Sequence, residues 1–126
     1  MYLLLIRHGQ SEGNTRPDVD LPDSQLTETG HRQASLLADA MDGLSIDRII
    51  VSPLHRAIQT ARPLATRRQL RIEVWPDLRE LRYTTDTRGA TADEWGELHP
   101  DVEPFWTADP TLEALLTPQG WRYPGA

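Results

Sequence analysis

Four side chains that could handle a phosphate group stand where short apolar runs of this 126-residue sequence end. Arg7 and His8 follow the first run, and Arg56 lies one helical turn beyond the second. Glu80 lies in the loop after the third run. A guanidinium can grip two oxygens of a phosphate, and an imidazole can attack phosphorus or transfer a proton. Each residue alone is more often an ordinary charged or core-edge residue, but their joint placement predicts a site for a tetrahedral anion.

The apolar runs themselves predict the strands of a parallel sheet. Tyr2–Ile6 is continuously apolar, which is typical of a strand buried on both faces. Ile49–Val51 is a short apolar run that predicts a second strand, and the alternation of Arg71–Val74 predicts a third strand, a candidate for an edge. Because helical stretches separate these runs, the connections are expected to be right-handed crossovers. Ligands bind at the carboxyl ends of parallel strands, so the candidate side chains should meet at one rim.

Two helices are expected between the strands. Thr27 can cap a helix over residues 28–41. Ser52 can cap a helix over residues 53–67, which a proline opens. Pro63 is expected to kink or shorten this second helix. The positions expected to face the core are Ala34, Leu37, Ala38 and Met41 in the first helix and Leu54, Ala57, Ala61, Leu64 and Ala65 in the second.

The remaining residues are expected to form loops and a tail within a single domain of residues 1–126. Residues 9–26 are polar and rich in turn-forming residues, which predicts a long loop of the kind that often carries function. Thr91 and Glu94 can form a capping box for a short helix over Ala92–Leu98. Five of the ten prolines follow this helix, so residues 101–126 are expected to be an irregular tail.

The composition excludes several classes of protein. The net charge is −6, and the excess of acidic residues lies entirely beyond residue 85, so no basic surface for nucleic acid is expected. The densest basic stretch, residues 67–71, lies where a helix should end and where cations suit the helix dipole. The absence of Cys excludes disulfides and thiolate metal sites. No apolar run is long enough for a membrane span or a signal peptide, which favours a cytoplasmic protein.

Four blocks of the sequence resemble a known family. Residues 5–14, which read LIRHGQSEGN, are similar to the opening motif of the histidine phosphatase superfamily, the phosphoglycerate mutase-like proteins. Residues 26–34, 52–61 and 78–80 resemble its further blocks in the same order and at the same spacing. The resemblance covers about residues 2–100. It implies an α/β fold with three layers, α/β/α, around a mainly parallel sheet.

The resemblance also implies a mechanism. His8 would attack the substrate phosphorus and become a phosphohistidine, while Arg7 and Arg56 hold the phosphoryl oxygens and Asn14 adds a donor. Glu80 would protonate the leaving alcohol and then activate water. No metal and no cofactor are implied, because the four His residues show no ligand spacing. The expected ligand is a small phosphorylated metabolite or inorganic phosphate.

Two departures from the family pattern decide between activities. The Lys-containing stretch of the family's mutases is absent after Glu80, which favours a phosphatase over a phosphoglycerate mutase. The second catalytic His of the family has no counterpart, because His99 lies at the end of a predicted helix. A noncatalytic fragment or pseudoenzyme that binds a phosphorylated ligand or a protein is therefore the alternative.

The missing counterpart of the second catalytic His also predicts an incomplete domain, truncated before the family's later strands. The chain would then be a piece of a longer protein, be completed by another chain, or cover the gap with residues 101–126. Tyr2–Ile6 would have an open apolar edge, and such edges promote self-association.

Overall fold

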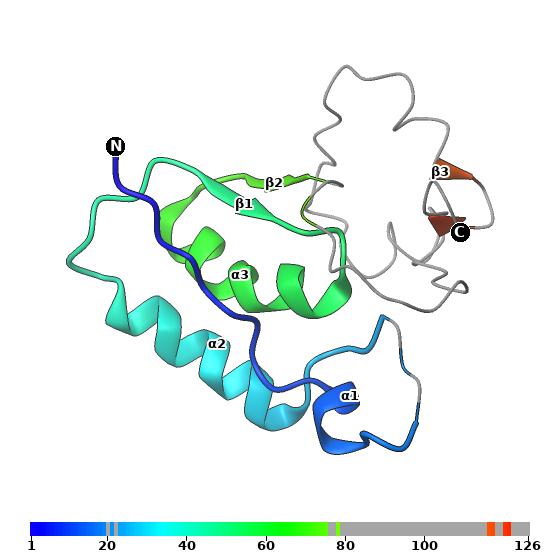
Figure 1. Cartoon of the computed structure of the whole chain (residues 1–126). Helices are drawn as coiled ribbons and strands as arrows, with labels where there is room; N and C mark the ends of the chain where they lie inside the picture. The colour runs from blue at the N-terminus through cyan, green and yellow to red at the C-terminus, as the bar shows by residue number, and fades with distance from the viewer. Residues whose placement is uncertain (20, 22, 76–77, 79–115, 118–119, 122–126) are drawn as a thin grey trace.

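The computed structural model describes residues 1–19, 21, 23–75, 78, 116–117 and 120–121 (Figure 1). The helices are α1 (Glu12–Thr15), α2 (Glu28–Ala40) and α3 (His55–Arg68), and the strands are β1 (Ile49–Val51), β2 (Ile72–Val74), β3 (Leu116–Thr117) and β4 (Gly120–Trp121). The predictions for Glu80, for the helix over Ala92–Leu98 and for His99 lie outside the described residues.

The sheet of the described region is a parallel pair with a helical crossover. β1 pairs with β2 in parallel, with Ile49 opposite Ile72 and Val51 opposite Val74. α3 connects the two strands and packs on both, and α2 packs on α3. The prediction of two parallel strands joined by a helix is therefore confirmed. The antiparallel pair β3–β4 lies within the predicted tail, which is thus not irregular throughout.

The prediction of a buried first strand is wrong. Tyr2 is fully exposed and Ile6 is 46% exposed, and this segment belongs to no strand. Within the described residues the sheet pairs β1 with β2 only. The N-terminal segment therefore pairs with no strand of this sheet. A continuous apolar run becomes a buried strand only where neighbours pair with it and layers cover both of its faces.

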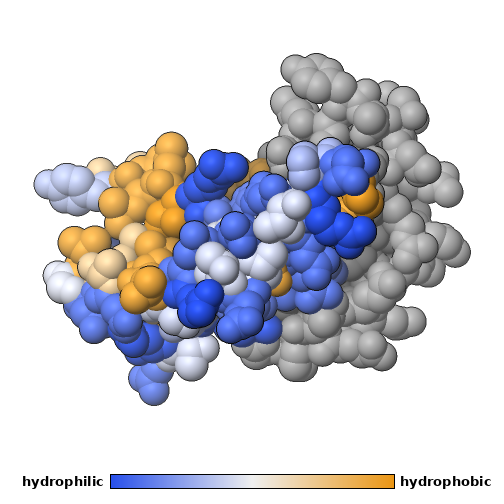
Figure 2. Space-filling model, turned by 90° about the horizontal axis from the view of Figure 1, so that it is seen from below, coloured by the Kyte–Doolittle hydropathy of each residue, from blue (hydrophilic) through white to orange (hydrophobic). Residues whose placement is uncertain are grey.

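The exposed N-terminal segment gives the molecule an apolar surface. Met1–Ile6 are all exposed, as are Leu36, Leu44 and Ile50. In Figure 2 apolar residues gather at one end of the face, away from the residues drawn in grey. This surface is unlike that of an ordinary soluble monomer, where large exposed apolar side chains occur singly.

α2 forms where the sequence predicts it. The Thr27 hydroxyl accepts a hydrogen bond from the Gly30 amide at 3.1 Å, which satisfies one of the donors that a helix leaves free in its first turn. Ala34 and Ala38 are almost fully buried, Met41 is buried, and Leu37 is half-buried at the edge of the core. None of the helices in the described part of the chain is long and apolar enough to cross a membrane.

α3 begins two residues later than expected. Leu54 has an extended backbone, with φ −76° and ψ 138°, and the helix starts at His55. The Ser52 hydroxyl accepts only a long hydrogen bond, 3.4 Å, from the Leu54 amide, and therefore does not cap the helix. Pro63 lies inside the helix, which continues to Arg68 and ends on Gln69 with a left-handed φ of 53°.

The core lies between the two long helices and the sheet. Ile58 of α3 has no exposed surface, although the sequence pattern favoured its half-buried neighbour Ala57. The core residues are Ala38, Met41, Ile49, Ile58, Ala61, Leu64, Ala65, Ile72 and Val74. The other positions predicted to face the core from this helix region, Leu54, Ala61, Leu64 and Ala65, are all buried, so the predicted face is correct apart from Ala57.

The basic end of α3 also holds the end of α2. Arg67 pairs with Asp39 at 2.5 Å and with Asp42 at 3.3 Å. Arg68 donates hydrogen bonds from Nη2 to the carbonyl oxygens of Met41 and Leu44. These carbonyls follow the last residue of α2, so Arg68 ties the chain just after α2 to the end of α3. The prediction that this basic stretch lies where a helix ends is confirmed, since Arg67 and Arg68 are in the last turn of α3.

The ion pair between Arg48 and Glu73 gives a testable pH dependence. Arg48 Nε and Nη2 donate to the Glu73 carboxylate at 2.9 and 2.6 Å. These hydrogen bonds hold the pKa of Glu73 below its ordinary value, with burial opposing them. The pair therefore stabilises the fold above the ordinary pKa of Glu, and this stability is lost as pH falls through the lowered value. We expect Glu73→Gln to reduce the fall in the free energy of unfolding between about pH 5 and 3.

The measurement is urea unfolding at several pH values. Glu28→Gln is the control, since Glu28 is exposed and lies 4.0 Å from Arg32. An unchanged pH dependence in Glu73→Gln would contradict the assignment.

Candidate functional site

The backbone of His8, Gly9 and Gln10 lies directly against the first turn of α2. A Cβ at Gly9 would lie 2.8 Å from the Gly30 carbonyl oxygen, and a Cβ at Gly30 would lie 2.1 Å from that of Gln10. Both distances are below any normal contact between carbon and oxygen. The close approach therefore requires glycine at both positions.

Three hydrogen bonds from separate elements fix this backbone. The Gly9 amide donates to Thr60 Oγ1 of α3 at 2.9 Å, and the Gln10 amide donates to Gln33 Oε1 of α2 at 2.8 Å. The Gln10 carbonyl accepts from the Thr27 amide at 3.0 Å. The segment that carries His8 is thus tied to both long helices although it is not part of the sheet.

The imidazole of His8 has a defined tautomer when it is neutral. Its Nδ1 lies 2.7 Å from the carbonyl oxygen of Gly9. A carbonyl oxygen can only accept, so Nδ1 must carry the proton of this hydrogen bond. The neutral ring then has its lone pair on Nε2, and the half-buried His8 can use this atom as a nucleophile or a base.

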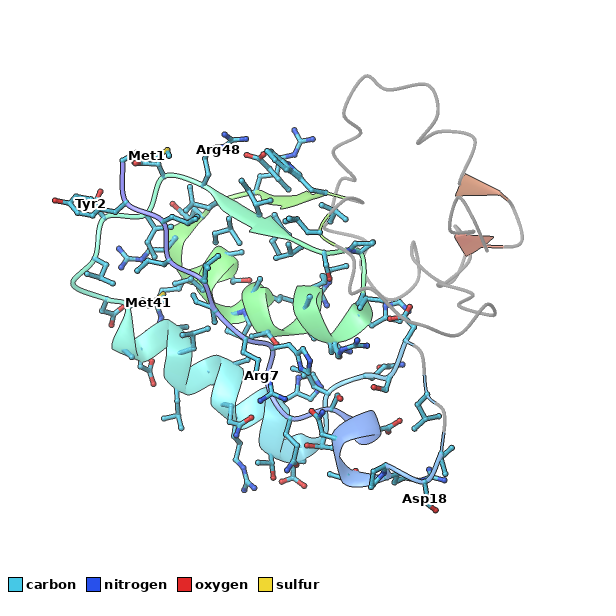
Figure 3. All side chains as sticks on the ribbon, in the orientation of Figure 1. Met1, Tyr2, Arg7, Asp18, Met41 and Arg48 are labelled. Carbon is cyan, nitrogen blue, oxygen red and sulfur yellow. The ribbon has the colours of Figure 1, made fainter. Side chains whose placement is uncertain are left out.

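A hollow of about 600 Å³ brings several of the candidate residues together. It is lined by Ile6, Arg7, His8, Gly9, Gln10, Asn14, Gln33, Ala34, Leu37 and Thr60. Figure 3 shows Arg7 on the N-terminal segment beside α2. Within the described residues no carboxylate pairs with the Arg7 guanidinium, which leaves it available to an anionic ligand.

Asn14 is held by a short helix that the sequence analysis missed. α1 lies in the predicted loop, and Asn14 Oδ1 accepts hydrogen bonds from the amide and the hydroxyl of Ser11 at 3.0 and 3.1 Å. Because Oδ1 is engaged in this way, Nδ2 is the group that Asn14 can offer to a ligand. The spacing of Ser11 and Asn14, three residues apart, was the available signal for a capping interaction.

Arg56 lies in the first turn of α3 and is only 4% exposed. It is not among the residues that line the hollow, but its carbonyl oxygen accepts the Thr60 hydroxyl proton at 2.6 Å. Its turn is therefore linked to Gly9 through a single hydroxyl group. Of the predicted site residues, Arg7, His8 and Asn14 meet at the hollow and Arg56 lies buried in the helix behind it.

The N-terminus of α3 is already occupied by a protein carboxylate. Asp23 Oδ1 accepts a hydrogen bond from the His55 amide at 2.9 Å, and Oδ2 lies 3.6 Å from His55 Nε2. This helix end is therefore filled by an internal contact with Asp23. A carboxylate is a suitable cap because it complements the positive end of the helix dipole. Sequence reasoning missed Asp23, because Ser52 offered a local cap and Asp23 lies 32 residues from His55.

The other histidines of the described region are accounted for by their places in the fold. His31 is exposed on α2 and donates its backbone amide to the Thr27 carbonyl at 2.9 Å. His55 is buried beside Asp23. Among the described residues no group of three or more His, Asp or Glu side chains is placed to hold a metal ion.

Comparison with known proteins decides the family. The family model described as "Histidine phosphatase superfamily (branch 1)" matches residues 3–121. The chain belongs to this superfamily. Its α/β fold and the motif around His8 are those that the sequence resemblance implied.

Individual relatives agree with the superfamily assignment. The uncharacterized protein Rv0525 of Mycobacterium tuberculosis is 36% identical over 111 residues, which cover 81% of this chain and 55% of that protein. The adenosylcobalamin/alpha-ribazole phosphatase of Escherichia coli is 37% identical over 83 residues, covering 64% of this chain and 40% of the relative. The chain thus spans about half the length of the curated relatives it matches.

A solved structure agrees in fold. The mycobacterial glucosyl-3-phosphoglycerate phosphatase, in the structure titled as a complex with VO3, superposes with a TM-score of 0.56 at 31% identity. The match covers 74% of this chain and 46% of that one.

The glycine contact predicts a specific sensitivity. Gly30→Ala would place a methyl group on the Gln10 carbonyl, so the segment carrying His8 must move away from α2. We expect a loss of roughly 1–3 kcal/mol in the free energy of unfolding. Gly43→Ala is the matched control, because its Cβ would have nothing within 4 Å. Urea unfolding of both variants tests the contact, and equal stability of the two would disprove it.

Proposed function

We propose that this chain is a phosphomonoesterase that acts on a small phosphorylated metabolite through a phosphohistidine on His8. The observation that carries the proposal is the hydrogen bond from His8 Nδ1 to the Gly9 carbonyl, which leaves Nε2 free for attack. The nucleophile lies in the same hollow as Arg7, whose guanidinium can hold two phosphoryl oxygens.

The proposed reaction has two displacements at phosphorus. In the first, His8 Nε2 forms a bond to phosphorus, the ester P–O bond breaks, and the leaving alkoxide takes a proton from Glu80. In the second, Glu80 takes a proton from water, the water oxygen bonds to phosphorus, and the N–P bond breaks to release phosphate. Arg7 and Asn14, which line the hollow, stabilise the negative charge on the phosphoryl oxygens in both transition states, and Arg56 is given the same role from its motif. Glu80 receives its role from its motif alone, since it lies outside the described residues.

The substrate is proposed only as a class. The names of the phosphatases given above specify different phosphorylated compounds, and no described feature of this chain selects one of them. Inorganic phosphate is the expected product ligand. The stretch after Glu80 lacks the Lys of family mutases, which favours hydrolysis over phosphoglycerate mutation. The cytoplasm is the proposed compartment, and neither nucleic acid nor a membrane is a proposed partner.

The proposal predicts a covalent intermediate on one histidine. Purified chain treated with radiolabelled para-nitrophenyl phosphate should retain acid-labile, base-stable label. His8→Ala should abolish the label, because His8 is the one histidine among the described residues that lines the hollow. His31→Ala is the control and should label as the wild type does, since His31 is exposed on α2.

The labelling experiment also separates the two candidate functions. Label on the wild-type chain that survives in His8→Ala would disprove the assignment of His8. A chain that binds phosphate but retains no label would instead support a noncatalytic, phosphate-binding role.

Self-association through the N-terminal segment is a second proposal about this protein's partners. Leu5 is 87% exposed, and Tyr2–Ile6 has no charged side chain, so the same segment of a second copy is a suitable apolar contact. If the wild type self-associates, its average mass measured by sedimentation should rise with concentration. Leu5→Glu should reduce this rise. Ser35→Glu, at an exposed polar position of α2, should leave that mass unchanged. A wild-type monomer at all concentrations would contradict the proposal.

A further inference from the structure

We propose that Thr60 is a positioning residue that sets the tautomer of His8 and its placement relative to Arg56. The inference rests on the proposed function, because it assigns a role to a residue behind the proposed nucleophile. Thr60 is buried in α3, and its hydroxyl group contacts both of the segments that supply phosphate-binding residues.

The hydrogen-bond directions at Thr60 Oγ1 are fully determined. The Arg56 carbonyl can only accept, so it receives the single hydroxyl proton at 2.6 Å. The Gly9 amide can only donate, so it uses a lone pair of the same oxygen at 2.9 Å. One oxygen atom thus joins the turn of α3 that carries Arg56 to the residue next to His8.

The same glycine controls the imidazole. The Gly9 amide is bound to Thr60, while the Gly9 carbonyl accepts the Nδ1 proton of His8 at 2.7 Å. If the amide loses its partner, a buried donor is left unsatisfied and the backbone must shift to reach water. The carbonyl then moves as well, and neutral His8 loses the acceptor that favours a proton on Nδ1. The fraction of rings with a free Nε2 lone pair falls.

Thr60→Val and Thr60→Ser form a matched pair for the test. Valine keeps the shape of threonine without the hydroxyl, whereas serine keeps the hydroxyl. Thr66→Val makes the same change at an exposed position of the same helix and serves as the control. In the wild type, Thr60→Ser and Thr66→Val, NMR of the imidazole nitrogens should show the Nδ1–H tautomer of neutral His8. In Thr60→Val it should show a mixture of tautomers.

The kinetic readout is the rate of phosphohistidine formation from para-nitrophenyl phosphate. A misplaced nucleophile costs on the order of 10²-fold in rate, and we expect a loss of about this size in Thr60→Val with the rate restored in Thr60→Ser. An unchanged tautomer and rate in folded Thr60→Val would overturn the proposal. If the wild type forms no phosphohistidine, the proposed function fails, and the tautomer comparison alone decides the role of Thr60.

A measurement on the wild type covers the case in which Thr60→Val does not fold. The Gly9 amide should exchange with solvent slowly because Thr60 holds it. Fast exchange of this amide in an otherwise protected α3 would overturn the proposal.

Discussion

The close contact between the backbones of Gly9–Gln10 and Gly30 is the constraint on which the rest of the site depends. Two chain segments can approach to this distance only where neither has a Cβ. The contact fixes the distance between the His8 segment and α2. At this distance the amides of Gly9 and Gln10 can hydrogen-bond to side chains of both long helices. The site is therefore assembled by backbone packing first and by polar side chains second.

This arrangement explains how His8 is held without a sheet around it. In most α/β enzymes a catalytic residue at a strand end is positioned by the neighbouring strands. Here the described residues replace that support with hydrogen bonds of 2.8 to 3.0 Å from α2, α3 and the turn before α2. Gly9, the buried residue of this segment, has both its amide and its carbonyl hydrogen-bonded, as buried backbone groups require.

Features with local causes could be predicted from the sequence, and those with distant causes could not. α2 follows from the Thr27 cap and its apolar spacing, and β1 and β2 follow from short apolar runs. The exposure of Tyr2–Ile6 depends on partner strands, which no local pattern reports. The candidate phosphate-binding residues were proposed from their type and motif. Their supports were missed because Thr60 lies 51 residues from Gly9, and Asp23 lies 32 residues from His55.

The paired ends of α2 and α3 have a consequence for the way in which the molecule opens. An isolated helix frays from its last turn, where carbonyl groups have no partner. Here Arg67 pairs with Asp39 of α2 and with Asp42, and Arg68 donates to carbonyls just beyond α2, so the end of one helix cannot open without breaking contacts with the other. The two helices should therefore behave as one cooperative unit in local unfolding. Because both of them anchor the His8 segment, that segment should be lost in the same event.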